Sequence, residues 1–372
     1  MRLKSILESL SLVAPEIQPG LGVHNLLFIA AELLLLNSDT NGSLKLAVIE
    51  ELEAHLHPQA QLRLISYLQK EYNDSGVQVI VSTHSSILAS KINVKNLILL
   101  KNDTSFNLSA EYTGLEKGDY LFLQRFLDST KANLFFAKGI IMVEGDAESL
   151  LIPTLADVIG INLEKHGISV VNVGGTGFFR YSRIFLRKDG SAIDVPISII
   201  TDCDIEPDKK AGEIDQREAE TTAAIVAIQQ KYNVGCINAF VAPKWTFEYS
   251  VAFSCLRDML YESILQAKKI ENSDQYALTA TKIEEIEKKL AEEKAKWSTQ
   301  EPCVTAHQIY HDTMLNKGNP AVKTNGTSKA IVAQCLASNL RWAITEISSL
   351  GEGGNSLPKE CMFDLHLYQT HI

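Results

Sequence analysis

Residues 136–155 read FAKGIIMVEGDAESLLIPTL, an apolar run that ends in acids and continues as a helical pattern. The run Ile140–Val143 predicts a buried strand, and Asp146 predicts the N-cap of the helix that follows. Glu144 closes the strand, and Glu148 lies four residues later, in the first turn of the helix. We therefore expect both carboxylates to face the same point beyond the edge of a sheet.

A second pair of acids follows a later apolar run, in the segment ISIITDCD at 197–204. If this segment is extended, its period of two places Asp202 and Asp204 on the same side. With Glu144 and Glu148, four carboxylates would then converge from neighbouring strand ends and repel one another. Hard oxygen ligands of this kind suit Mg²⁺ or Mn²⁺, which relieve the repulsion, so the sequence predicts a metal site here.

The segments around these acids alternate between strand and helix patterns. Residues 168–173 and 236–241 predict two more strands, and a glycine-rich turn, GGTG at 174–177, precedes another helix. Such alternation is typical of a parallel α/β sheet. The charged segment 281–297 differs, because it predicts an exposed helix inserted into this region or projecting from it, with a short coiled-coil arm as an alternative.

An earlier part of the chain has the same organisation. Apolar runs at 44–49, 77–81 and 96–100 predict strands of a parallel sheet, and the apolar spacing at 58–72 predicts a crossover helix. Residues 101–135 are more mixed in character. We expect them to form a connector with an edge hairpin.

Acids and a histidine follow two of these early strands. Glu50 and Glu51 end the first strand, and His84 ends the second, within VIVSTHSS at 79–86. One acid at such a strand end can hold Mg²⁺ while the next polarises a water against a γ-phosphate. Two alternatives stay open: the acids are simply solvated, or the HLH segment at 55–57 is a metal-binding pair.

No phosphate-binding loop of the G-x-x-x-x-G-K-[ST] type occurs in the sequence. That loop supplies the backbone N–H groups and the lysine that hold nucleotide phosphates. We therefore expect negligible ATP hydrolysis by this chain alone, and we expect ATP as a cofactor only where the missing N-terminal part of an ATPase is present.

The composition bounds the class of protein. A chain of 372 residues exceeds one ordinary domain, so two or more are expected. A formal charge of −10 argues against nucleic-acid binding through overall charge, but it permits a local basic groove or acids that a metal neutralises. Six scattered cysteines indicate reduced thiols. The longest apolar run, 26–36, is too short for a membrane span, so we expect a cytoplasmic protein with no membrane partner.

The segment EELEAHLHPQAQ, followed by VIVSTHSS, resembles the Walker B, D-loop and switch-histidine stretch of ABC-type ATPases of the SMC and Rad50 kind. On that resemblance Glu50 is the magnesium acid, Glu51 the catalytic glutamate and His84 the γ-phosphate sensor. The upstream GLGVHNLLFIAAELL stands where the signature motif and its helix lie, although it departs from LSGGQ. Leu52 also departs from the family pattern, which usually has proline there.

The later pattern, strand–Glu-Gly, helix, strand, then strand–Asp-x-Asp, resembles the TOPRIM fold of topoisomerases, bacterial primases and some nucleases. With the ATPase-like segment before it, the chain resembles the OLD (overcoming lysogenization defect) family of ATPase–nucleases, which includes the nuclease subunit of the Gabija anti-phage system. This resemblance implies that Thr246 and Glu248, in KWTFEY, are additional metal ligands. It also implies that Lys329, in NGTSKA, stabilises charge on the scissile phosphate. The structural alternatives are a glutamate in a loop and a lysine in the first turn of a helix.

The expected fold is α/β: a partial ABC-type ATPase head with a parallel sheet, followed by a Rossmann-like TOPRIM domain with a helical insertion. We expect the ATPase-like part at 1–105, a connector at 106–135, the TOPRIM core at 136–256, the insertion at 257–300 and the C-terminal part of the nuclease domain at 301–372.

The implied function is a metal-dependent DNA endonuclease with two Mg²⁺ or Mn²⁺ ions per site. The implied partners are DNA, further copies of the chain in a homodimer or higher oligomer, and a UvrD-like helicase encoded alongside. The alternatives are a nuclease-inactive ATPase-like module for dimerisation or regulation, or another TOPRIM activity of the primase or topoisomerase kind.

The expected catalytic residues are Glu144, Glu148, Asp202 and Lys329. The expected metal ligands are Glu144, Glu148, Asp202, Asp204, Thr246 and Glu248. The basic candidates for contacts with DNA phosphates are Arg180, Arg183, Arg187 and Lys188.

Overall fold

The two α/β patterns of the sequence form separate units, residues 1–136 and 137–372, here called the N-terminal unit and the C-terminal unit. The structure is a computed structural model. It describes residues 20–38, 44–75, 77–207, 214–273, 278–315 and 326–349. The finer division expected from the sequence stays a prediction.

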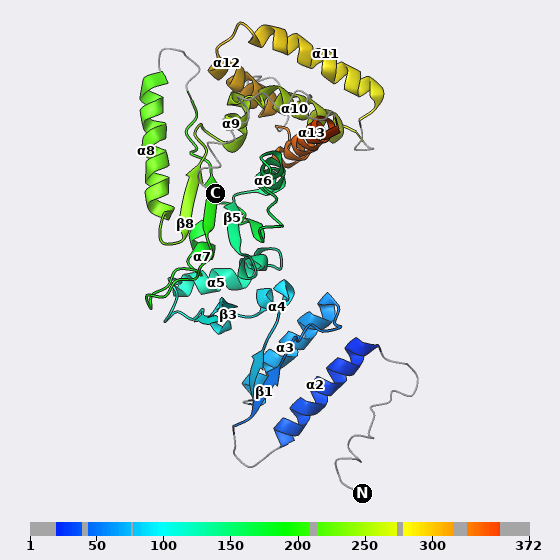
Figure 1. Cartoon of the computed structure of the whole chain (residues 1–372), viewed down its shortest axis with the longest axis vertical. Helices are drawn as coiled ribbons and strands as arrows, with labels where there is room; N and C mark the ends of the chain where they lie inside the picture. The colour runs from blue at the N-terminus through cyan, green and yellow to red at the C-terminus, as the bar shows by residue number, and fades with distance from the viewer. Residues whose placement is uncertain are drawn as a thin grey trace. The chain divides into compact units, whose positions relative to one another are not determined.

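A parallel pair of short strands forms the centre of the N-terminal unit (Figure 1). β1 (Leu46–Ile49) pairs with β2 (Gln78–Val81), and α3 (Pro58–Ser75) makes the crossover between them, as the apolar spacing predicts. α2 (Leu21–Ser38) precedes them. Apolar side chains of both helices and of the turn after β1 cover one face of the strand pair. The buried members of this core are Ile29, Leu33, Leu52, Leu56, Ala60, Leu64, Ile65, Leu68, Val77 and Leu88.

Helix α2 approaches the turn after β1 so closely that one of its positions requires glycine. A Cβ atom on Gly22 would lie 2.3 Å from the carbonyl oxygen of His55, far inside contact distance. The side-chain amide of Asn25 donates a hydrogen bond to the carbonyl of Ala54 at 3.2 Å. Helix α2 is therefore held against the segment that follows Glu50 and Glu51.

The third early strand does not extend the parallel sheet, and this corrects the sequence prediction. β3 (Ile98–Lys101) pairs antiparallel with β4 (Thr104–Asn107) in a separate two-stranded sheet. Its turn residues, Asn102 and Asp103, have φ angles of 49° and 58°, a region that Asn and Asp tolerate better than most residues. The predicted hairpin is present, but it takes residues 98–101 as its first strand, because the two-residue turn makes local pairing possible.

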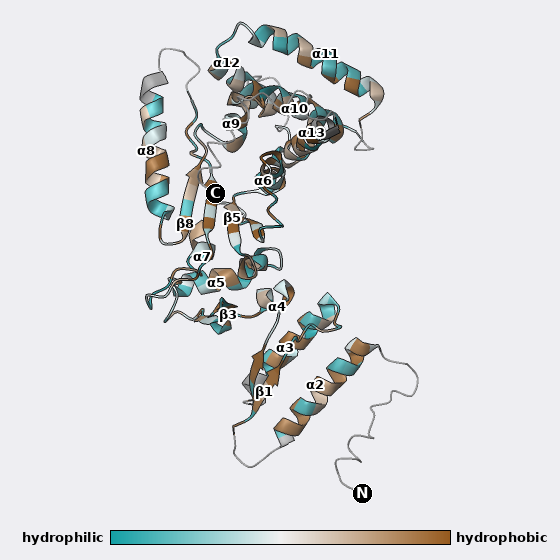
Figure 2. Cartoon of the chain, in the orientation of Figure 1, coloured by the Kyte–Doolittle hydropathy of each residue, from teal (hydrophilic) through white to brown (hydrophobic). Residues whose placement is uncertain are grey.

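The outer face of the β1–β2 pair is apolar and exposed. Val48, Ile80 and Leu46 have exposed fractions of 64%, 58% and 41%, and β1 is coloured as strongly hydrophobic in Figure 2. Burial alternates along both strands, which places these side chains on one face. Within the described residues, this sheet is therefore buried on one side only, whereas parallel sheets are normally covered on both.

The remaining described elements of this unit are helical, two of them between β2 and β3 and two after β4. They are α4 (Ser86–Lys91), η1 (Val94–Asn96), α5 (Lys117–Phe126) and η2 (Lys131–Phe135).

A four-stranded parallel sheet forms the centre of the C-terminal unit, in the order β6-β5-β7-β8. Its strands are β5 (Gly139–Val143), β6 (Ile168–Asn172), β7 (Ile197–Thr201) and β8 (Ile237–Val241). All residues of β5 are buried, as expected for an inner strand. Since β5 and β7 are parallel neighbours, the strand ends before Glu144 and Asp202 lie side by side, as the sequence predicts.

Helices flank this sheet. α6 (Asp146–Val158) follows β5, α7 (Phe178–Ser182) follows β6, and α8 (Ile214–Tyr232) packs beside β8 (Figure 1). The N-cap of α6 is Gly145 rather than Asp146, because the extended backbone ends one residue earlier than predicted. Asp146 is the first helical residue, where its charge still suits the positive end of the helix dipole.

The largest apolar core of the C-terminal unit is helical. It is built by α6, α9 (Phe247–Phe253), α10 (Arg257–Glu271), α12 (Pro302–His307), η3 (Gln308–Met314) and α13 (Lys329–Ser349). Across the described ranges, no helix combines the length and the apolar character that a membrane crossing requires.

The charged segment predicted to form an exposed helix is α11 (Ala280–Trp297), and it packs along α10 rather than projecting as an arm (Figure 1). Its buried side chains are Ile286 and Trp297. The ring of Trp297 meets Tyr261 of α10 edge-on, with centroids 5.1 Å apart. A narrow apolar stripe, to which the partly buried Leu290 also belongs, is enough to attach an otherwise charged helix.

Replacing Leu336 by alanine should lower the free energy of unfolding by about 2–5 kcal/mol, because its side chain is 1% exposed within the helical core. Trp342 lies on the same helix but is 64% exposed, so Trp342→Ala is the matched control. That variant should change stability by about 0.5 kcal/mol or less. Urea denaturation followed by circular dichroism measures both. Equal losses would contradict the packing of α13 described here.

Candidate functional site

Two acidic strand ends are joined at the C-terminal edge of the four-stranded sheet. Glu144 follows β5, and its carboxylate accepts a hydrogen bond from the hydroxyl of Thr201, the last residue of β7. The same oxygen lies 3.2 Å from the backbone N–H of Asp202, which donates to it. Glu144 therefore ties the end of β7 to the end of β5 and holds Asp202 next to itself.

Glu148 lies in the first turn of α6 and is 8% exposed. Its Oε2 atom packs against Gly145, where an added Cβ would be only 3.2 Å away. Burial raises the pKa of Glu148, and the nearby carboxylates of Glu248 and Glu144 raise it further, against the opposing charge of Lys329. Glu148 is thus part of one electrostatic cluster with residues from three other segments.

Asp202 is the most perturbed carboxyl of the cluster. Burial, with the repulsion of Glu248 and Glu144 in addition, raises its pKa from 3.8 to about 7. This rise persists although Asp202 Oδ1 accepts a 2.7 Å hydrogen bond from the backbone N–H of Phe247. Asp202 is therefore fixed at the N-terminus of α9, close to acids that disfavour its charge.

Glu248 lies in the first turn of α9 and is 3% exposed. Its Oε2 atom accepts a hydrogen bond from the ammonium of Lys329 at 2.9 Å. Its Oε1 atom is buried and has no hydrogen-bond partner among the described residues. A buried carboxylate oxygen without a donor is costly, and it is therefore a candidate for a ligand position.

Lys329 is the first residue of α13, and its side chain reaches this carboxylate from a remote part of the chain. Burial would favour the neutral amine, but the charge of Glu248 outweighs it and raises the pKa of Lys329. Tyr310 lies beside the pair, with the Lys329 ammonium 5.8 Å from the centroid of its ring. Sequence reasoning missed Tyr310, since one tyrosine in a helix carries no motif.

Thr246 and Asp204, the two other expected metal ligands, differ in their burial. Thr246 is buried and caps α9, with its hydroxyl accepting from the N–H of Tyr249 at 3.2 Å. Asp204 is exposed and has a φ of 57°, so the extended segment assumed for the period-two argument ends before it. Its N–H donates to the carbonyl of Trp245, itself at φ 40°, at 2.9 Å. Metal binding by Thr246 and Asp204 stays a prediction.

The donor set fits a hard divalent cation. Glu144, Glu148, Asp202 and Glu248 offer only oxygen atoms, and among the described residues Lys329 is the counter-charge of this group. Mg²⁺ and Mn²⁺ prefer carboxylate oxygens, and a cation here would offset the repulsion that raises the two pKa values. It would also supply a partner for the buried Oε1 of Glu248.

The ATPase-like residues lie at the matching edge of the N-terminal sheet. Glu50 and Glu51 follow β1, and His84 follows β2; all three are exposed. Glu51 has a φ of 46°, and its N–H donates to the hydroxyl of Ser82 at 3.2 Å. The parallel register of the strands brings both loops to one edge, as the sequence predicts. Their catalytic roles stay a prediction.

Glu53 fixes the loop that carries His84, and sequence reasoning missed it. Its carboxylate accepts from the hydroxyl of Thr83 at 2.7 Å and from the backbone N–H of His84 at 2.6 Å. These hydrogen bonds, helped by the nearby charge of His84, outweigh partial burial and lower the pKa of Glu53. The E-x-x-E spacing in EELE was visible in the sequence, but nothing local assigns it this partner.

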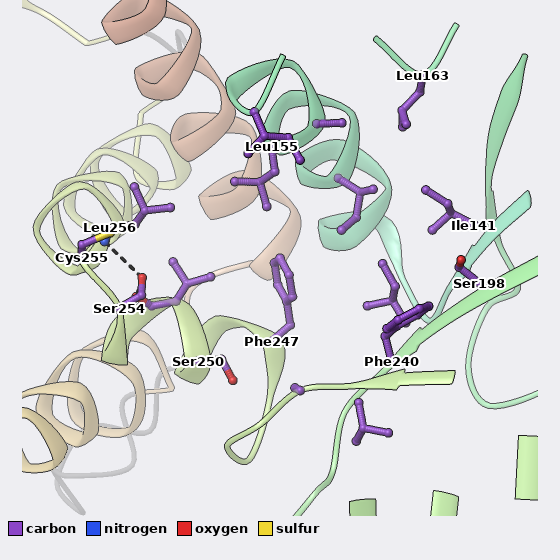
Figure 3. A pocket seen from close by; sticks show the side chains of 17 residues that line it. Ile141, Leu155, Leu163, Ser198, Phe240, Phe247, Ser250, Ser254, Cys255 and Leu256 are labelled. Carbon is purple, nitrogen blue, oxygen red and sulfur yellow. Dashed lines mark hydrogen bonds between the residues drawn. The ribbon is translucent and has the colours of Figure 1, made fainter. Parts of the chain in front are cut away.

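The C-terminal unit also contains an apolar cavity, and no charged side chain lines it. It has a volume of about 170 Å³ and is lined by side chains such as Ile141, Leu155, Phe240 and Phe247 (Figure 3). Its few polar lining groups are the hydroxyls of Ser198, Ser250 and Ser254. The chemistry therefore lies with the carboxylates and not with this cavity.

The basic residues after the glycine-rich turn are less available than the sequence suggests. Helix α7 ends at Ser182, so of the four candidates only Arg180 lies on it. The guanidinium of Arg183 lies 5.1 Å from the centroid of the Phe179 ring. Arg187 pairs with Asp189, and its side chain is 4% exposed. Arg187 is therefore a structural residue and a poor candidate for a contact with DNA.

The sequence matches two known families in the regions that carry these residues. Residues 135–204 match the family described as overcoming lysogenization defect protein-like, TOPRIM domain. Residues 13–89 match the AAA ATPase domain family. The first match includes Glu144, Glu148 and Asp202, and the second includes Glu50, Glu51 and His84.

Two relatives have similar sequences over part of their length. Endonuclease GajA of Bacillus cereus strain HuB5-5 is 32% identical over 224 residues, which cover 52% of this chain and 32% of the relative. Old nuclease of Escherichia phage P2 is 31% identical over 183 residues, which cover 47% of this chain and 30% of the relative. The chain therefore spans about a third of the length of these relatives.

Among solved structures, the C-terminal region of the Xanthomonas campestris pv. campestris OLD protein matches at 20% sequence identity with a TM-score of 0.32, covering 64% of this chain and 99% of that chain. The sequence matches identify the two parts of the molecule. The chain therefore contains an AAA ATPase segment followed by a TOPRIM domain of the overcoming-lysogenization-defect type, and over these parts it is similar to OLD-family nucleases.

Proposed function

We propose that this chain is a Mg²⁺- or Mn²⁺-dependent DNA endonuclease that acts in the cytoplasm. The observation that carries the proposal is the cluster of Glu144, Glu148, Asp202 and Glu248, with one buried carboxylate oxygen that lacks a partner among the described residues. The names of two relatives, endonuclease GajA and Old nuclease, support a nuclease activity, and DNA is our proposed substrate.

Each carboxylate has a distinct part in this proposal. Glu144 and Asp202, joined at the ends of β5 and β7, would hold one ion together with Glu148. Glu248 would serve a second ion, with Thr246 and Asp204 at the rim of the cluster. When bound, such ions supply Lewis acidity toward a phosphate and lower the pKa of water. The protein keeps the carboxylates fixed and largely buried, so that they are in place before the substrate arrives.

Lys329 would stabilise the negative charge that develops on the phosphate during cleavage. Its ammonium is held 2.9 Å from Glu248, at the centre of the acidic cluster, and its raised pKa keeps it charged at neutral pH. The ammonium also offsets part of the negative charge of the carboxylates. This second role was not expected from the sequence, which indicated only the contact with the phosphate. A phosphate entering the site would meet this charge directly, since the lysine side chain is 42% exposed.

Three further properties are proposed on the family relationship. We expect homodimers or higher oligomers, a helicase partner encoded alongside, and ATP as a cofactor only where a complete ATPase part is present. The alternative function, a nuclease-inactive module for dimerisation or regulation, predicts an intact carboxylate cluster without cleavage. Incubation of supercoiled plasmid with the chain and Mn²⁺ separates the two: a scaffold leaves the plasmid intact.

Asp202→Asn or Glu144→Gln should reduce plasmid cleavage in Mn²⁺ by at least about a hundredfold, because each removes a charged ligand from the cluster. Glu164→Gln, at an exposed position outside the cluster, is the matched control and should cleave at the parental rate. Rates are measured from gel-resolved nicked and linear products. Cleavage by Asp202→Asn at the parental rate would remove Asp202 from the site.

Lys329→Ala should lower the single-turnover cleavage rate at saturating DNA and Mn²⁺ by at least tenfold, with only a modest loss of DNA affinity. Lys329→Arg should recover part of the rate, since it keeps the charge, and Lys165→Ala at an exposed position is the control. A Lys329→Ala rate within twofold of the parent would eliminate Lys329 from the chemistry.

The metal-free protein should lose stability as the pH rises from about 4 to about 7. The pKa of Asp202 is higher in the folded protein than its ordinary value, so the folded state binds the extra proton in this window, and the free energy of unfolding falls with pH. Asp202→Asn should therefore have a Tm several degrees above the parent at pH 8 in EDTA. The difference should vanish near pH 5, where Asp202 is protonated. Equal melting temperatures of the two proteins at pH 8 would contradict the raised pKa of Asp202 in the folded state.

A further inference from the structure

A second group of metal-binding side chains lies outside the carboxylate cluster. His307 ends α12, His311 follows in η3, and Glu206 comes from the loop after β7. One ligand atom from each residue lies within 4.8 Å of the other two. The H-x-x-x-H spacing was visible in the sequence, but the carboxylate arrives from about a hundred residues earlier in the chain.

The two histidines are brought together by the helix on which they lie. Residues four apart share a helix face. Here the helix also widens to π geometry, with the N–H of Leu315 donating to the carbonyl of Tyr310, five residues back, at 2.9 Å. The imidazole rings stack with centroids 4.5 Å apart and planes 24° apart. Two rings held in this way can direct a nitrogen each toward one point, and π-helical turns are frequent at functional sites.

Both ring nitrogens of His311 face a carboxylate. Its Nε2 atom lies 3.6 Å from Oε1 of Glu206, and its Nδ1 atom lies 2.8 Å from Oδ1 of Asp312. A hydrogen bond from Nδ1–H to a carboxylate fixes the orientation of a metal-binding imidazole and leaves Nε2 as the ligand atom. Asp312 therefore supplies the outer partner that such a ligand requires.

The surroundings suit a partly enclosed ion. His307 is 6% exposed, the His311 side chain is 12% exposed, and the Trp245 ring lies 6.3 Å from each of them. A simple ion pair between Glu206 and His311 is the alternative. It accounts for those two residues, but not for the second imidazole, whose ligand atom lies within 4.8 Å of the ligand atoms of both.

We propose that Glu206, His307 and His311 form a binding site for one transition-metal ion of the Zn²⁺ kind, with Asp312 orienting His311. Two imidazoles and one carboxylate are a donor set that zinc accepts, and they leave a fourth position for water. The all-oxygen carboxylate cluster prefers harder ions. This proposal does not depend on the proposed nuclease activity.

Such an ion would link two segments that border the carboxylate cluster. Glu206 lies four residues after Asp202, and the two histidines flank Tyr310, whose ring lies next to Lys329. The ion would therefore attach the loop after β7 to helix η3. Without the ion, this attachment rests on the weak contact between Glu206 and His311.

Titration of the full chain with Zn²⁺ alone, by isothermal calorimetry, tests the proposal. The Glu144→Gln, Asp202→Asn double variant serves as the background, so that the carboxylate cluster does not contribute. We expect one equivalent to bind. Glu206→Gln and His311→Gln should each weaken its affinity at least tenfold, and Asp312→Asn should weaken it by about 10–100-fold. His166→Gln, at an exposed position, should stay within twofold of the background.

Absorption of Co²⁺ in place of Zn²⁺ gives a second measurement. Four-coordinate Co²⁺ should produce strong visible bands in the background protein, and these should disappear in His311→Gln, while circular dichroism shows that the variant remains folded. Zn²⁺ affinity unchanged in both Glu206→Gln and His311→Gln would overturn the proposal. Loss of all Zn²⁺ binding in the background protein would overturn it too, since the ion would then belong to the carboxylates.

Discussion

Repulsion among buried carboxylates is the constraint on which the C-terminal unit depends. Glu148, Asp202 and Glu248 are drawn together from three segments, and among the described residues Lys329 is the opposite charge that lies against them. A single ammonium cannot balance them, so burial and mutual repulsion raise the pKa values of Glu148 and Asp202. The site is therefore adapted to a cation and is less stable without one.

The backbone around this cluster is strained where it turns toward it. Asp204 and Trp245 both have positive φ angles, which non-glycine residues rarely adopt, and a hydrogen bond joins them. Strain of this kind persists only where the surrounding packing over-determines it. Here the helical core of α6, α9, α10 and α13 supplies that packing, and it also presents Lys329 at the start of α13 to Glu248.

Both units carry their polar residues at the carboxyl ends of parallel strands, but the two sheets differ in how far other elements cover them. In parallel sheets the carboxyl ends of neighbouring strands meet at one edge, and loops there can carry chemistry. The four-stranded sheet is enclosed, so its acids are partly buried and their pKa values shift. The two-stranded sheet is covered on one face within the described residues, and Glu50, Glu51 and His84 stay exposed, with Glu53 holding the histidine loop.

The sequence by itself determined the strands, the crossover helices and the acids at the strand ends, because apolar periodicity and turn residues are local signals. It also indicated that Glu144, Glu148 and Asp202 would converge, since neighbouring parallel strands end at one edge. It assigned the strand at 96–100 to the wrong sheet. The residues of a strand do not determine whether it pairs with a distant strand or with the next strand in a hairpin.

Only the tertiary structure decided the contacts between remote segments. The pairing of Lys329 with Glu248 joins residues 81 positions apart, and sequence could suggest it only through a family resemblance. No family resemblance pointed to Tyr310, to Glu53 or to the group of Glu206, His307 and His311. Their surroundings arise from the packing of helices and loops whose side chains meet only after the apolar cores have formed, and a local pattern cannot encode which distant partner they meet.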